Sequence, residues 1–180
     1  MIKVVFVGGA STGKSSLCNF IANKLKKPIR KEDYLDFMKR NNLNTLEEFK
    51  PRNADFVQEM QNDETIIKNE FPDAQVLFCD NAPLSWLVGF EIVFGEHNQA
   101  LADITEQMDY DIYILCENEL EFEDDGIRPS KEYCDTHHAK TIEFLDNNGI
   151  TYHTVSGTIE ERTLQVEGIL KNVNIQTFKR

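Results

Sequence analysis

The feature that most constrains the fold is a glycine-rich segment between an apolar run and an amphipathic pattern. Residues 2–7 read IKVVFV, which is typical of a buried strand, and residues 8–15 read GGASTGKS. Residues 17–25 then repeat apolar side chains at helical spacing. A strand, the pattern Gly-x4-Gly-Lys-Ser and a helix, in this order, predict a loop whose backbone N–H groups surround the phosphates of a nucleotide.

Each part of this loop has a chemical reason. Glycines let the backbone curl so that successive N–H groups converge on phosphate oxygens, and the helix N-terminus adds partial positive charge. Lys14 would reach the β and γ phosphates, and the Ser15 hydroxyl would bind Mg2+. The alternative is a chance match or a loop that has lost binding. The predicted contacts with ATP are Gly8, Gly9, Ala10, Ser11, Thr12, Gly13, Lys14, Ser15 and Ser16.

Apolar runs of strand length recur along the chain and alternate with helical patterns. They cover residues 2–7, 75–79, 111–116 and 151–155. Continuous apolar runs are typical of buried parallel strands, and their alternation with helices predicts an α/β layer structure with right-handed crossovers. A length of 180 residues favours one domain, residues 1–180.

Two polar segments interrupt this alternation. Residues 26–73 predict two or more helices and a short strand near residues 28–30. They form either a substrate-covering module or a pair of packed helices without ligand contact. Residues 117–130, ENELEFEDDGIRPS, carry six carboxylates and then a glycine and a proline, which indicate a loop.

The overall charge restricts the partners of the chain. A formal net charge of −12 at pH 7 repels phosphate backbones and anionic membranes, so neither nucleic acid nor a membrane is expected as a partner. A small anion such as ATP can still be held by backbone amides, a lysine and Mg2+. No apolar run is long enough to span a bilayer, and the N-terminus indicates a first strand and not a signal peptide.

The cysteines are scattered, which favours buried thiols in a reduced, cytoplasmic protein. They are Cys18, Cys79, Cys116 and Cys134. Cys134 begins a C-x-x-H-H sequence, but a structural zinc site needs four ligands and the chain offers no second pair.

We expect structural roles for three histidines and for three aromatic residues that recur at helical spacing. His97, His137 and His138 lie in polar helical surroundings, and we expect a solvated face without a functional role. Trp86, Phe90 and Phe94 recur at helical spacing, which indicates a core, although one of these rings could stack on a flat ligand.

Asp80 ends an apolar run, at the position where a strand-end carboxylate faces the ligand in doubly wound α/β folds. It could hold Mg2+ or take the proton from an attacking hydroxyl. The alternative is the N-cap of a helix that starts near Pro83.

Two further segments offer ligand contacts. Arg128 lies on the Gly/Pro loop and could swing over the triphosphate, although the residues alone favour a charge balance with its acidic neighbours. Gly157 and Thr158 precede the last helical pattern and can pass the adenine ring, over which Arg162 could lie. A threonine helix cap explains this turn without a ligand.

Four stretches together resemble the ribosylnicotinamide kinase domain of NadR proteins, within the wider NadR-like P-loop ATPase/kinase group. They are GGASTGKSS from Gly8, VLFCD ending at Asp80, EFEDDGIR ending at Arg128 and SGTIEER ending at Arg162. The likeness covers most of the chain, and the four stretches follow in the same order and spacing. The acidic pair before Gly-Ile-Arg is the most specific part of the likeness.

The resemblance implies a P-loop fold with three α/β/α layers and a five-stranded parallel sheet, a helical substrate side over residues 28–72 and a lid over residues 117–130. It implies transfer of the ATP γ-phosphate to the 5′-hydroxyl of nicotinamide riboside, a small-molecule acceptor, giving the mononucleotide. By matching position, the catalytic residues are Lys14, Asp80 and Arg128, the Mg2+ ligands are Ser15 and Asp80, and the substrate side holds Glu32, Asp33 and Tyr34.

The chain departs from the family where the acceptor would bind. Glu32-Asp33 replaces an Arg-Glu pair, and Asn81-Ala82 replaces the Thr-Asp that often follows the aspartate. Two other functions are therefore open: a kinase for another nucleoside or nucleotide, and a nucleotide-binding switch. A switch would carry N-K-x-D for base recognition and D-x-x-G after the strand, and the sequence has neither motif there.

Overall fold

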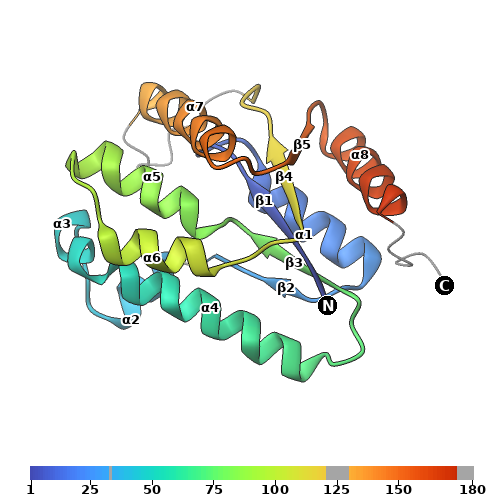
Figure 1. Cartoon of the computed structure of the whole chain (residues 1–180), viewed down its shortest axis with the longest axis horizontal. Helices are drawn as coiled ribbons and strands as arrows, with labels where there is room; N and C mark the ends of the chain where they lie inside the picture. The colour runs from blue at the N-terminus through green and yellow to red at the C-terminus, as the bar shows by residue number, and fades with distance from the viewer. Residues whose placement is uncertain (33, 121–129, 174–180) are drawn as a thin grey trace.

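Five parallel strands form one sheet in the order β2-β3-β1-β4-β5 (Figure 1). The structure is a computed structural model and describes residues 1–32, 34–120 and 130–173. The elements follow one another as β1 (Ile2–Val7), α1 (Lys14–Leu25), β2 (Ile29–Arg30), α2 (Tyr34–Arg40), α3 (Leu46–Phe49), the 3-10 helix η1 (Lys50–Arg52), α4 (Asn53–Glu70), β3 (Val76–Asp80), α5 (Pro83–Phe94), α6 (Gln99–Gln107), β4 (Ile112–Cys116), α7 (Lys131–Asn147), β5 (Tyr152–Val155) and α8 (Ile159–Asn172).

The side chains of β1 alternate between two hydrophobic cores, because successive residues of a strand point to opposite faces of the sheet. Val4 and Phe6 pack with α1 and α8, whereas Val5 and Val7 pack with residues of α4, α5 and α7. Figure 1 shows α1 and α8 on one side of the sheet and α4, α5, α6 and α7 on the other. This arrangement confirms the predicted three-layer α/β/α fold with a five-stranded parallel sheet.

The predicted strands agree closely with the observed ones. β1 spans the expected residues, and β3, β4 and β5 each differ from the predicted run by one residue at one or both ends. In the sheet, Phe6 of β1 lies beside Asp80 of β3 and Ile114 of β4. The segments that leave the carboxyl ends of β1, β2 and β3 therefore meet at one edge of the sheet, where ligands bind in folds of this class.

The segment between β2 and β3 is helical, as expected. Its longest helix, α4, buries Phe56, Val57 and Met60. The rings of Phe49 and Phe56 lie 5.6 and 5.0 Å from that of Trp86 on α5, measured between centroids. These aromatic contacts join the segment to the core, so packing accounts for Trp86.

The structure also bears on the cysteines, on membrane-spanning helices and on the predicted lid. All four cysteines are buried free thiols. Within the described ranges, no helix is long and apolar enough to cross a membrane. Residues 121–129, which hold Arg128 and most of the predicted lid, lie outside the described residues, and so does Asp33.

Candidate active site

The glycine-rich loop turns sharply between β1 and α1. Gly8 and Gly13 have φ values of 139° and 77°, and Gly13 is the N-cap of α1. Side chains disfavour these backbone angles, so the two glycines allow a loop shape that other residues could adopt only under strain. A Cβ atom on Gly8 would also lie 2.8 Å from the carbonyl oxygen of Cys116.

The second residue of the loop, Gly9, packs directly against α7. Its N–H donates to Nδ1 of His138 (3.2 Å), and an added Cβ atom would lie 2.7 Å from the carbonyl oxygen of Cys134. His137 and His138 are both buried. The expectation of a solvated face was therefore wrong for these two histidines, because the inner face of α7 carries polar residues and hydrophobic spacing does not mark it.

Lys14 and Ser15 begin α1 at the mouth of the loop. Lys14 Nζ donates to the carbonyl oxygen of Gly9 (3.2 Å), which also accepts from Thr12 Oγ1 (2.9 Å). Ser15 Oγ donates to Asp80 Oδ1 (3.0 Å). The fold thus brings the serine of the loop and the carboxylate of β3 into contact, although they are 65 residues apart in the sequence. Ala10 and Ser11 complete the loop, and Ser16 is exposed on the first turn of α1.

Asp80 is the last residue of β3 and is only 3% exposed. The helix-cap alternative is excluded, because α5 begins at Pro83 and its N-cap is Ala82, without a side-chain capping bond. Burial raises the pKa of Asp80, and Lys14 and the hydrogen bond from Ser15 oppose that rise. A carboxylate that has lost water in this way gains from a cation beside it.

A second carboxylate, that of Glu32, lies just after β2 at the same edge of the sheet. Its Oε2 accepts a hydrogen bond from Asn81 Nδ2 (2.9 Å). Burial raises the pKa of Glu32, whereas the positive charge of Lys14 lowers it. The positive charge of Lys14 therefore acts on two carboxylates, which follow or end neighbouring strands, and lowers the pKa of both. Tyr34, two residues further, begins α2 and places its ring 5.0 Å from that of Trp86.

The turn before α8 has a structural cap and also contacts the loop. Thr158 and Glu161 form a capping box, as the threonine-cap interpretation expects. Arg162 is 2% exposed and donates from NH1 to the carbonyl oxygen of Thr12 (2.6 Å) and from Nε to that of Gly157 (2.9 Å). Its guanidinium thus supports the phosphate loop, and a position over an adenine ring stays a prediction.

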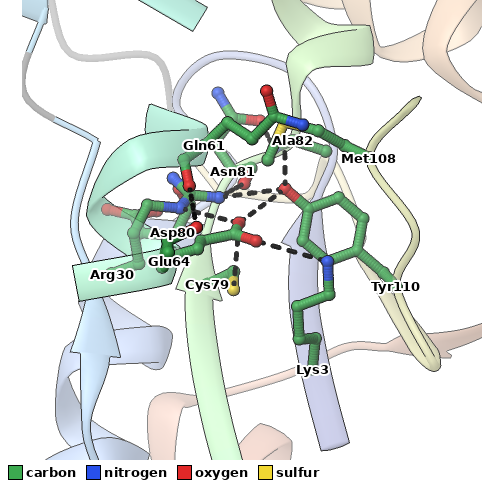
Figure 2. Close-up of polar contacts among 11 residues, drawn as sticks. Lys3, Arg30, Gln61, Glu64, Cys79, Asp80, Asn81, Ala82, Met108 and Tyr110 are labelled. Atoms are coloured by element: carbon green, nitrogen blue, oxygen red, sulfur yellow. Dashed lines mark hydrogen bonds and ion pairs between the residues drawn. The ribbon is translucent and has the colours of Figure 1, made fainter. Parts of the chain in front are cut away.

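Arg30, Glu64 and Tyr110, to which sequence reasoning assigned no role, form a buried network behind Asp80 (Figure 2). The only local signal was an arginine next to an apolar residue in a short strand. Its partners Glu64 and Tyr110 are 34 and 80 residues away, so no spacing rule connects them.

His137 gives a prediction for stability against pH. Its Nε2 contacts the carbonyl oxygen of Ser85 (2.9 Å), and burial lowers its pKa from 6.5 to about 4. The unfolded chain binds a proton at this histidine more readily than the folded chain does. The neutral, buried His137 therefore contributes fully to the free energy of unfolding above pH 6.5, and this contribution of about 3 kcal/mol is lost as the pH falls to about 4. Urea unfolding of the wild type and of His137→Gln at several pH values should show a smaller loss in the variant. Equal losses would contradict this role of His137.

Comparison with known proteins places the chain. A family model described as "AAA domain" matches residues 3–162. The chain belongs to this AAA domain family. No match was found among curated proteins. The match to the AAA domain begins within β1 and ends at Arg162, so it includes the loop, Asp80 and the contact between Arg162 and the loop.

Solved structures share the fold of this AAA domain. A NadR protein in complex with NR has a TM-score of 0.75 at 13% identity, and one with NAD and AMP-PNP has a TM-score of 0.70 at 15% identity; each match covers 99% of this chain and 51% of the NadR chain. The chain therefore spans about half the length of these NadR proteins. Thymidylate kinase from Ehrlichia chaffeensis has a TM-score of 0.66 at 16% identity, and the match covers 94% of this chain and 98% of the kinase. Deoxyadenosine kinase from M. mycoides has a TM-score of 0.64 at 14% identity, and the match covers 95% of this chain and 100% of the kinase. At these identities the likeness shows the fold alone.

Proposed function

We propose that this AAA domain is an ATP-dependent kinase of a small nucleoside-type molecule, and that nicotinamide riboside, phosphorylated on its 5′-hydroxyl, is the first acceptor to test. The observation that carries this proposal is the meeting of Lys14 and Ser15 with two shielded carboxylates, Asp80 and Glu32, at one edge of the sheet. A nucleotide switch needs a phosphate loop, but it has no need of a second carboxylate beside the first.

The residues of the loop fit a nucleoside triphosphate with Mg2+. The hydroxyl of Ser15 and the carboxylate of Asp80 lie 3.0 Å apart, and both are hard oxygen ligands of the kind that Mg2+ prefers. We assign the ion to these two groups, where it would neutralise charge on the phosphates when bound. Lys14 and the backbone N–H groups of the loop hold the phosphates themselves, except for the N–H of Gly9, which bonds to His138. Gly157 and Thr158 are proposed for the adenine side, and Arg128 for closing over the phosphates.

We assign different roles to the two carboxylates and place Glu32 on the side of the acceptor. Asp80 bonds to Ser15 of the phosphate loop, whereas the carboxylate of Glu32 bonds to Asn81 and not to the loop. We assign to Glu32 the proton of the acceptor hydroxyl, whose oxygen bonds to the γ-phosphorus as the bond to the β-γ bridging oxygen breaks and ADP leaves. A raised pKa suits this task, since a base works best when its pKa approaches the working pH.

A kinase of another nucleoside or nucleotide is the second candidate. The sequence departs from the family at Glu32-Asp33 and Asn81-Ala82, and of these residues Glu32 and Asn81 bond to each other beside the proposed acceptor position, which favours this candidate. The fold likeness to thymidylate kinase and deoxyadenosine kinase is compatible with it as well. Both candidates use the same loop and the same two carboxylates.

One experiment separates these candidates. The protein is incubated with ATP, Mg2+ and a panel of nucleosides and nucleotides that includes nicotinamide riboside, and ADP and phosphorylated products are followed by mass spectrometry. Nicotinamide mononucleotide as the preferred product supports the first candidate, and another phosphorylated nucleoside supports the second. No acceptor-dependent ADP with any compound would overturn both and favour a switch.

A further inference from the structure

Arg30 is a fully buried arginine whose guanidinium reaches the end of the neighbouring strand. It is 0% exposed, and it donates from NH1 to the carbonyl oxygen of Asp80 (2.7 Å) and from NH2 to that of Asn81 (2.6 Å). Figure 2 shows Arg30 among these residues. Arg30 therefore fixes the two consecutive carbonyl groups at which β3 ends.

The guanidinium of Arg30 is itself held from two other elements. Glu64 of α4 accepts from its Nε (3.2 Å), and the hydroxyl of Tyr110, just before β4, accepts from NH2 (3.3 Å). Glu64 also accepts from Tyr110 (3.0 Å) and from Lys3 Nζ (3.3 Å), as Figure 2 shows. Burying charged groups costs free energy even when they are paired, and an apolar cluster often stabilises a core as well. Stability alone therefore explains this network poorly.

Asn81 connects the end of β3 to the second carboxylate. Its φ of 63° lies in the left-handed region, which asparagine tolerates better than most residues. Its side chain donates from Nδ2 to Glu32 (2.9 Å) and accepts at Oδ1 from the N–H of Ala82 (3.0 Å). The turn at Asn81 thus sets the direction of the chain after Asp80 and, through its side chain, the place of Glu32.

We propose that Arg30 and Asn81 form a positioning unit that holds Asp80 and Glu32 at the spacing required for phosphoryl transfer. Arg30 acts on the backbone of residues 80 and 81, and Asn81 passes this constraint to Glu32 through its amide. Glu64 and Tyr110 lock the guanidinium. Neither member of the unit touches the reacting atoms. The inference rests on the proposed kinase function of the same site.

The first test replaces Arg30 by lysine, which keeps the positive charge beside Glu64 but cannot reach two carbonyl oxygens with a rigid fork. We expect kcat to fall about 10- to 100-fold, as for loss of partners that orient catalytic ligands, with the KM for ATP and the Kd for AMP-PNP within about twofold of wild type. The matched control is Arg40→Lys, an exposed arginine that pairs with Asp36 and Glu59. It should leave kcat unchanged.

The second test works at Asn81 and leaves the pair of Arg30 with Glu64 in place. Asn81→Asp keeps an acceptor for the N–H of Ala82 and tolerance of the left-handed turn, but it removes the donor to Glu32 and adds a negative charge beside it. Asn81→Gly keeps the turn and removes both side-chain bonds without adding charge. Both variants should lower kcat by about 10-fold or more while nucleotide affinity is retained. If Arg30→Lys does not fold, these variants and Tyr110→Phe decide the question.

Crystal structures of wild type, Arg30→Lys and Asn81→Asp complete the test, because they show the positions of the two carboxylates without relying on turnover. We expect the carboxylate of Glu32 to move in Asn81→Asp and the peptide between residues 80 and 81 to rotate in Arg30→Lys. Folded variants with wild-type kcat, or with both carboxylates unmoved, would overturn the positioning unit. A wild type that phosphorylates no acceptor overturns the proposed function instead, and the crystal structures then still decide whether the unit holds the two carboxylates.

Discussion

Replacing Lys14 with alanine should lower turnover by about 100-fold or more with every acceptor that the wild type uses. Lys14 supplies a positive side-chain charge at the mouth of the loop, and its charge also lowers the pKa of both Asp80 and Glu32. The change therefore removes charge stabilisation from the phosphates and makes both carboxylates harder to ionise. Initial rates of ADP formation at saturating ATP measure the effect.

Lys24→Ala is the matched control for this experiment. Lys24 lies on the same helix, but its side chain is 45% exposed and pairs with Glu167 at the surface. Exposed ion pairs contribute little to stability, so this variant should keep wild-type turnover. Full activity of Lys14→Ala would mean that the phosphates bind elsewhere and that the site is wrongly assigned.

Exchanging Glu32 for glutamine should lower kcat by about 100- to 10,000-fold, the range over which a general base contributes. Glutamine has the same shape, but it cannot take a proton from the acceptor hydroxyl. The magnesium concentration for half-maximal turnover should stay at the wild-type value. In Asp80→Asn, by contrast, this concentration should rise, because the charge beside Ser15 is lost.

The two carboxylates can thus be told apart by a magnesium titration of each variant. Glu47→Gln, an exposed position on α3 in the same helical segment, serves as the control and should behave like the wild type. If Glu32→Gln instead raises the magnesium requirement and Asp80→Asn does not, the roles of the two residues are exchanged.

The fold could be predicted from the sequence because its determinants are local. Residues 2–7 form a strand since the run is apolar apart from Lys3 and its last four side chains suit a buried sheet. The loop follows because Gly8 and Gly13 supply backbone angles that few residues accept. Asp80 could be assigned to the same edge of the sheet because parallel strands align their carboxyl ends.

The supporting contacts of the site could not be predicted in this way. His138 bonds to Gly9 across 129 positions of the chain, and Tyr110 bonds to Arg30 across 80. Such partners are set by which helix covers which strand, and a polar side chain gives no period that marks it as buried. The helix-cap alternative for Asp80 was also open in the sequence, and only the start of α5 at Pro83 excluded it.

The hydrogen bond between Arg162 and Thr12 has a consequence for how the protein is made. The loop leaves the ribosome before two of its partners, His138 and Arg162. Until residue 162 has been synthesised and has left the exit tunnel, the carbonyl of Thr12 lacks this donor and the loop has no support from α8. Tight nucleotide binding should therefore arise only after residue 162 has emerged, and a nascent chain stalled before that point should not yet retain ATP.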